Sequence, residues 1–128
     1  MPSPLKKILY VEDEPDIRAI AQMALQAVGG FEVIACASGN DALLAAPEAM
    51  ADLLLLDVMM PGLDGPATLK ALREIPATSH TPVIFMTAKV QATEVAVYKA
   101  LGALEVIAKP FDPMELSDQI RKIWAQQA

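Results

Sequence analysis

The fold of this chain is decided by residues 53–65, which read LLLLDVMMPGLDG. Four consecutive leucines are typical of a strand that helices cover on both faces, as happens in a parallel sheet. The apolar run stops at the acidic Asp57, and a loop rich in turn-forming residues follows at 59–65. The segment therefore predicts a buried strand over 52–57 that delivers a carboxylate to the start of a loop.

Strand-like and helical patterns alternate along the rest of the chain. We expect strands over residues 5–11, 31–37, 52–57, 82–87 and 104–108. A helical pattern follows each strand: from Pro15 to Gly29-Gly30, from Ser38 to beyond Pro47, over 66–74, over 92–101, and after residues 112–115. Pro47 is expected to shorten or kink its helix. Five such βα units predict an α/β fold with a parallel sheet and helices on both of its faces.

Capping signals mark two of the expected helix starts. Ser38 with Asp41 resembles a capping box at the start of the second helix. Asp112 with Glu115 resembles another, and Pro113 would then take the first helical position. These signals predict that the second helix begins directly after Ser38 and the last helix directly after Asp112.

Composition and charge exclude several classes of protein. The chain has 128 residues, which predicts one domain over 1–128, and its net charge of −6 disfavours nucleic acid as a ligand. The single cysteine, Cys36, excludes an intramolecular disulfide and a cysteine-cluster metal site. No apolar stretch approaches the length of about 20 residues that a membrane span needs, and no secretory signal pattern is evident. We therefore expect an acidic protein of the cytoplasm.

Chemistry-bearing side chains follow the expected strands at their carboxyl ends, where ligands bind in open parallel α/β sheets. These are Glu12, Asp13, Asp57, Thr87 and Lys109. Three carboxylates at one edge repel one another, which predicts a raised pKa for at least one of them and favours an oxygen-ligated cation such as Mg²⁺. A cation, an ammonium and a hydroxyl together suit a phosphoryl group, which a carboxylate can attack to form an aspartyl phosphate.

Four segments resemble the receiver domain of bacterial two-component response regulators. They are Glu12-Asp13, LLLLDVMMPGLDG around Asp57, FMTAK around Thr87 and AKPFDP around Lys109, and they occur in this order over essentially the whole chain. The resemblance implies a flavodoxin-like, doubly wound (βα)5 sandwich of three layers, with five parallel strands in the order 2-1-3-4-5. It implies in particular a single-domain receiver of the chemotaxis type.

The resemblance also implies roles for the acidic residues and for one backbone group. Asp57 is expected to accept the phosphoryl group. Asp13 is expected to bind Mg²⁺ directly, Asp57 to belong to the same metal site, and Glu12 to support the ion through water. The backbone carbonyl of Met59 is expected to be a further metal ligand.

The remaining pocket residues also take their expected roles from the resemblance. Lys109 is expected to contact the phosphoryl oxygens and to pair with Asp57 beforehand, and the Lys109–Pro110 peptide is expected to be cis. Thr87 is expected to follow the phosphoryl group with its hydroxyl. The family usually has an aromatic residue or a histidine three residues before the pocket lysine, whereas this chain has Val106. No ring can therefore rotate behind Thr87, and the surface change must take another form.

Together these features predict a stand-alone phosphoacceptor module and not an enzyme. A sensor histidine kinase or a histidine phosphotransfer protein would donate the phosphoryl group. A downstream protein target would then recognise the changed protein–protein surface. The resemblance is compatible with a monomer or a weak dimer.

Three other functions compete with this prediction. The chain can instead be the receiver part of a larger DNA-binding regulator. A small phosphohydrolase with an aspartyl-phosphate intermediate is disfavoured, because such enzymes place a second acid two residues after the nucleophile, where this chain has Met59. A flavin-binding module needs a phosphate loop rich in Ser, Thr and Gly after its first strand, and Glu12-Asp13-Glu14 would repel a phosphate there.

Overall fold

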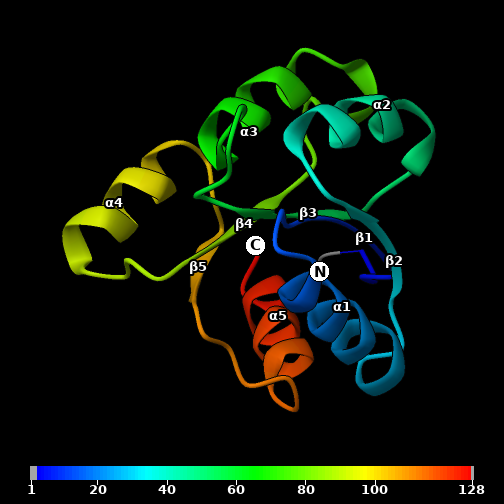
Figure 1. Cartoon of the computed structure of the whole chain (residues 1–128), viewed down its shortest axis with the longest axis vertical. Coiled ribbons are helices and arrows are strands. Elements are labelled where there is room, and N and C mark those ends of the chain that lie inside the picture. Colours follow the sequence, from blue (N-terminus) through cyan, green and yellow to red (C-terminus); the bar gives the residue numbers. More distant parts are fainter. Residues whose placement is uncertain (1–2, 128) are drawn as a thin grey trace.

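The computed structural model describes residues 3–127, which form a parallel five-stranded sheet in the order β2-β1-β3-β4-β5 (Figure 1). The strands are β1 (Lys7–Val11), β2 (Glu32–Cys36), β3 (Leu53–Asp57), β4 (Val83–Thr87) and β5 (Glu105–Ala108). The predicted doubly wound fold and strand order are thereby confirmed. Because β1 pairs with both β2 and β3, the strand order reverses beside β1, and this is where such sheets bind ligands.

Helices cover both faces of the sheet. They are α1 (Pro15–Met23), continued by the π-helix η1 (Ala24–Val28), then α2 (Gly39–Ala49), α3 (Gly65–Arg73), the short 3-10 helix η2 (Pro76–Thr78), α4 (Ala92–Ala100) and α5 (Leu116–Ala125). Figure 1 shows α1 and α5 on one side of the sheet and α2 and α3 on the other, with α4 beside β5. No helix within residues 3–127 has the length and apolar character that a membrane span requires.

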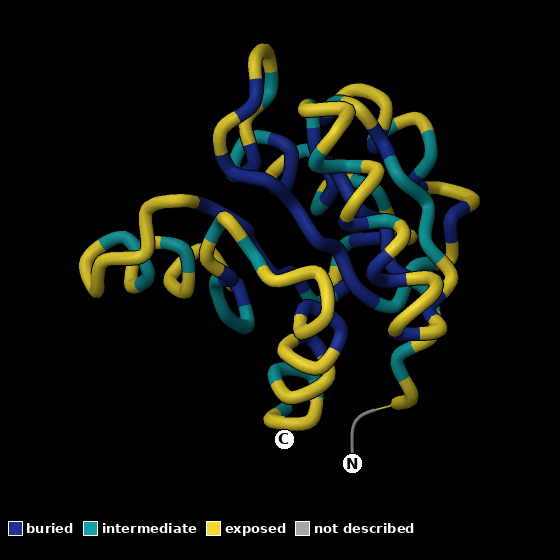
Figure 2. Tube along the Cα trace, turned by 60° about the horizontal axis from the view of Figure 1, so that its bottom comes forward, coloured by how far each residue is buried: buried dark blue, intermediate teal, exposed yellow. Residues whose placement is uncertain are grey.

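The leucines of β3 explain why the sheet lies between two layers of helices. Successive side chains of a strand point to opposite faces. Accordingly, Leu54 and Leu56 pack in the layer of α2 and α3, whereas Leu53 and Leu55 pack in the layer of α1 and α5. All four are fully buried, and β1, β3 and β4 run as mostly buried segments through the centre of the molecule (Figure 2). Full burial of each leucine contributes about 1.5–3 kcal/mol of stability.

The helix starts agree with the capping predictions only in part. Ser38 Oγ accepts a hydrogen bond from the backbone N–H of Asp41 at 3.1 Å, and α2 begins at the next residue, as predicted. The prediction for the last helix is wrong. Asp112 Oδ1 accepts from the N–H of Met114 at 2.9 Å, whereas the N–H of Glu115 donates to the backbone carbonyl of Asp112 at 3.0 Å, and α5 begins at Leu116.

Two helices have unusual interiors. Pro47 lies inside α2, which ends soon afterwards at Ala49, where Met50 adopts a left-handed conformation (φ 53°), and the expected kink at Pro47 stays a prediction. The first helix widens into η1, because the Ala24 carbonyl accepts from the N–H of Gly29, five residues later, at 3.1 Å. The buried Ser117 hydroxyl of α5 donates to the same carbonyl at 3.1 Å.

Candidate functional site

The carboxyl ends of the strands bring the predicted site residues to one edge of the sheet. Glu12 follows β1, Asp57 ends β3, and Thr87 ends β4. The backbone N–H of Lys109 donates to the carbonyl of Thr87 at 2.9 Å, which extends the ladder between β4 and β5 by one residue. The Lys109–Pro110 peptide is cis, as the resemblance implies.

Three carboxylates converge at this edge. Glu12, Asp13 and Asp57 each place one carboxylate oxygen within 4.8 Å of the others. The Glu12 residue is 1% exposed and Asp57 is 3% exposed, whereas Asp13 is half-buried. Because buried charges are costly unless they are compensated, this cluster requires positive charge nearby.

The ammonium of Lys109 supplies part of that charge. Its Nζ donates to Glu12 Oε1 at 2.8 Å and to Asp57 Oδ1 at 3.1 Å. Burial lowers the pKa of Lys109, but hydrogen bonds and attraction from the two carboxylates outweigh burial and raise the pKa above its usual value. The pair with Asp57 is the predicted one, whereas the shorter bond to Glu12 is not foreseen by the sequence.

Burial and repulsion within the cluster raise the pKa of the Asp57 carboxyl group. Its pKa is raised from 3.8 to about 7, first by burial and then by the charge of Glu12, and Lys109 opposes this rise only in part. The raised carboxylate pKa expected from the sequence is thereby found at Asp57. The single ammonium of Lys109 therefore does not balance the negative charge of the three carboxylates, and the cluster needs further positive charge.

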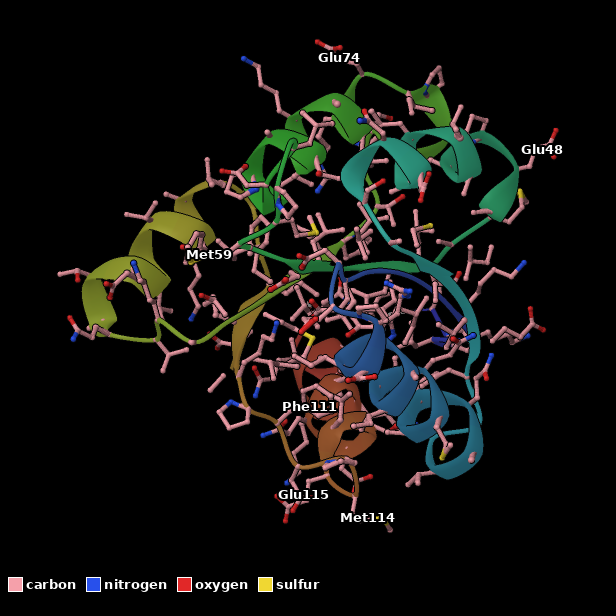
Figure 3. All side chains as sticks on the ribbon, viewed as in Figure 1. Glu48, Met59, Glu74, Phe111, Met114 and Glu115 are labelled. Atoms are coloured by element: carbon pink, nitrogen blue, oxygen red, sulfur yellow. The ribbon has the colours of Figure 1, made fainter. Side chains whose placement is uncertain are left out.

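The donor set fits a small divalent cation. Mg²⁺ prefers carboxylate and carbonyl oxygens and keeps several waters, so it needs few protein ligands. Glu12, Asp13 and Asp57 could hold such an ion, because each offers an oxygen to the same small volume. Met59 lies at the carboxyl end of β3 with its side chain 66% exposed (Figure 3). The predicted role of its backbone carbonyl stays a prediction.

Thr87 is buried at the edge of the site. Its hydroxyl oxygen accepts from the backbone N–H of Lys89 at 3.1 Å, which ties the start of the β4–α4 loop to the end of β4. Within residues 3–127, no hydrogen bond joins Thr87 to Asp57. Val106 is half-buried on the neighbouring β5 and carries no ring. If Thr87 moves toward a phosphoryl group as predicted, the hydrogen bond between the Thr87 hydroxyl and the backbone N–H of Lys89 must break.

Sequence reasoning missed two residues beside the acids. Arg18 of α1 donates from Nη1 to the backbone carbonyl of Glu12 at 2.8 Å. The sequence offered a signal for it, since a basic residue near a helix start is disfavoured by the helix dipole and needs a specific partner. Tyr10 is fully buried, and its hydroxyl has no hydrogen-bond partner within residues 3–127. Burial and the charges of Glu12 and Asp57 raise the pKa of that hydroxyl.

Curated relatives match nearly the whole chain. Residues 8–121 match the family described as response regulator receiver domain. The transcriptional regulatory protein CpxR of Escherichia coli strain K12 is 39% identical over 128 aligned residues, which cover 96% of this chain and 53% of that protein. The protein named "Probable transcriptional regulator ycf27" from Pyropia yezoensis is 38% identical, over 92% of this chain and 47% of that protein. The chain thus spans about half the length of these relatives.

Solved structures agree with the family match. The chemotaxis protein CheY4 of Vibrio cholerae superposes with a TM-score of 0.84 at 32% identity, over 94% of this chain and 99% of that one. A CheY-like receiver domain protein from Methanospirillum hungatei superposes with a TM-score of 0.79 at 26% identity, over 96% of each chain. The acidic cluster, the sheet order and these similarities lead to one conclusion: the chain belongs to the response regulator receiver domain family.

Proposed function

We propose that residues 1–128 form one stand-alone receiver domain of the cytoplasm, which accepts a phosphoryl group on Asp57 and thereby changes a protein–protein surface. A sensor histidine kinase or a histidine phosphotransfer protein donates the group, and a downstream protein responds to it. The observation that carries this proposal is the buried Asp57 carboxylate, held at 3.1 Å from Lys109 Nζ inside a cluster of three acids. The domain acts as a monomer or a weak dimer.

The chemistry assigned to the chain is a transfer between two residues. An ionised oxygen of Asp57 attacks the phosphorus of a phosphohistidine, and the phosphorus–nitrogen bond of the donor breaks. The bonding electrons stay on the imidazole nitrogen, which takes up a proton, and Asp57 becomes an acyl phosphate. Lys109, already within hydrogen-bond distance of Asp57, donates to the phosphoryl oxygens.

Mg²⁺ is the proposed cofactor, with Glu12, Asp13 and Asp57 as the residues that hold it and the Met59 carbonyl as a further ligand. When bound, it supplies positive charge that offsets the phosphoryl oxygens and the three acids. The domain is proposed to signal and not to turn over small substrates, because Met59 offers no acid to protonate a leaving group.

Intact-mass spectrometry tests this function. We expect a gain of one phosphoryl group, about 80 Da, when the protein is incubated with a small acyl-phosphate donor and Mg²⁺. The gain should disappear with a chelator and in Asp57→Asn. Asp64→Asn is the matched control, because Asp64 lies in the same loop but only caps α3 through the N–H of Ala67 at 2.8 Å. An adduct that persists in Asp57→Asn, or none with any donor, would refute the proposal.

A second reading places the same receiver in a longer regulator. The similarity to two transcriptional regulators, of which the chain spans about half, favours it. In that case the phosphoryl group on Asp57 would control a DNA-binding domain and not a free protein target. The mass of the protein in its native host separates the two readings, since a stand-alone domain has 13.7 kDa and a regulator of the relatives' size about twice that.

A further inference from the structure

Within residues 3–127, Arg18 forms no ion pair with a carboxylate, which distinguishes it from Lys109. Its Nη1 donates to the backbone carbonyl of Glu12 at 2.8 Å and lies 3.5 Å from that of Asp13. Lys109, in contrast, occupies one carboxylate oxygen of Glu12 and one of Asp57. Arg18 therefore brings a permanent positive charge to the acids and leaves their oxygens free.

The Arg18 contact is part of a small network that fixes the turn after β1. The N–H of Glu12 donates to the Cys36 carbonyl at 3.0 Å, which holds one side of this residue on β2. Glu12 Oε2 accepts from the N–H of Glu14 at 3.2 Å, and Arg18 N donates to the Glu14 carbonyl at 2.9 Å. The first turn of α1 thus holds the backbone and the side chain of Glu12 together.

The position of Arg18 makes this role physically reasonable. Side chains of a helix point back toward its N-terminus, so a long side chain in the first turns of α1 reaches the residues that precede the helix. A guanidinium at a helix N-terminus is opposed by the helix dipole, and here the two carbonyls compensate it. Arg18 is also half-buried, which strengthens its field relative to that of an exposed cation.

We infer that Arg18 is a positioning residue for the divalent cation, which orients the carboxylates of Glu12 and Asp13 by holding their backbone carbonyls. This inference rests on the proposed function, because it assumes that the acidic cluster binds Mg²⁺. Groups that orient metal ligands without touching the metal typically affect affinity by about 10–100-fold. Arg18 acts on two adjacent ligands at once through their shared turn.

Isothermal titration of the full chain with Mg²⁺ tests the inference. We expect Arg18→Met, which keeps the length of the side chain, to raise the dissociation constant about tenfold. Lys122→Met removes the same charge from an exposed position of α5 and should change it less than twofold. Arg18→Lys, with a charge and a donor but no planar fork, should recover part of the loss. If Arg18→Met does not fold, Arg18→Gln suits the half-exposed position and gives the same comparison.

A measurement without metal separates positioning from general stability. We expect amide hydrogen exchange in Arg18→Met to accelerate at Glu14, whose N–H donates to Glu12, while exchange at Leu55 in the buried sheet stays unchanged. A dissociation constant within twofold of the wild-type value, or equally faster exchange at Leu55, would overturn the role of Arg18 and leave the proposed function intact. If the wild-type protein itself fails to bind Mg²⁺, the proposed function and this inference are both refuted.

Discussion

Replacing Asp57 by asparagine should stabilise the metal-free protein, although it removes a hydrogen-bonded charged residue from the interior. Asp57 is 3% exposed and shares the site with the carboxylates of Glu12 and Asp13. Its ionisation in the folded state is opposed first by burial and then by Glu12. Asparagine has nearly the same shape and carries no charge, so it relieves this repulsion without leaving a cavity.

The magnitude follows from the pKa of Asp57. That pKa is about 7 in the folded protein against the usual 3.8, and each pKa unit corresponds to about 1.4 kcal/mol. Keeping Asp57 ionised in the folded state therefore costs at most about 4 kcal/mol relative to the unfolded chain. The attraction between Asp57 and Lys109 is already contained in this figure, because it lowers the pKa that burial and Glu12 raise. At pH 8 without metal, we expect Asp57→Asn to be more stable by about 2–4 kcal/mol.

The pH dependence has a definite sign. Below about pH 4, Asp57 is protonated in both states and the variant should have no advantage. Between about pH 4 and pH 7 the unfolded chain releases the proton of Asp57 while the folded protein keeps it, so the wild-type protein loses stability as the pH rises. Above about pH 7 the difference between variant and wild type should be constant.

Urea unfolding at several pH values, in chelator and in Mg²⁺, measures these effects. Mg²⁺ should stabilise the wild-type protein, by about 2.7 kcal/mol at a concentration of 100 times its dissociation constant, and should stabilise Asp57→Asn less. The exposed Asp118→Asn on α5 removes the same charge and should stay within about 0.5 kcal/mol of wild type. A variant Asp57→Asn that is no more stable than wild type in chelator at pH 8, or that keeps the same advantage at pH 4, would show that Asp57 is not destabilised by its ionisation.

Three further substitutions test the packing and the charges around the site by the same unfolding assay. Gly65→Ala should cost about 1–3 kcal/mol, because its Cβ would lie 2.6 Å from the Asp57 carbonyl oxygen; a variant as stable as wild type would contradict that close approach. Leu72→Ala, on the buried face of α3, should cost about 2–5 kcal/mol through the cavity that it creates, with Mg²⁺ affinity unchanged. Lys109→Met should cost about 3–5 kcal/mol at pH 8 in chelator, since it leaves Glu12 and Asp57 without their shared cation. Mg²⁺ should restore more stability to this variant than to wild type, and an equal gain in both would argue against competition between Lys109 and the metal.

The sequence predicts the fold well because the elements that define it are strongly patterned. The four leucines at 53–56 are compatible with little other than a strand buried on both faces, and they pack in both helical layers as that assignment requires. The last helix shows the limit of local signals. The Asp112 side chain has the correct spacing to cap the N–H of Glu115 but bonds the N–H of Met114 instead, because local side-chain-to-backbone hydrogen bonds compete with helix caps.

Much of the candidate site also follows from the sequence, because parallel strands must place their carboxyl ends at one edge. That rule brings Glu12, Asp57 and Lys109 together without any knowledge of distances. It cannot say which oxygens the ammonium contacts, since this depends on side-chain reach in three dimensions. The bond from Lys109 to Glu12 at 2.8 Å therefore appears only in the structure. The partner of Arg18 is also found only in the structure, because the sequence signals that this arginine needs a partner but not that the partner is the backbone carbonyl of Glu12.

The two cations beside the acids divide the compensation of charge between them. Three carboxylates together with Lys109 and Arg18 carry a formal charge of −1 when all are ionised, so the site keeps net negative charge for a cation. Lys109 occupies carboxylate oxygens and so competes with that ion, whereas Arg18 binds carbonyls and leaves the oxygens available. Removing either side chain takes away one positive charge, yet the two losses should move Mg²⁺ affinity in opposite directions. A purely Coulombic account would require the same direction for both, so the pair of variants decides whether position or net charge governs the site.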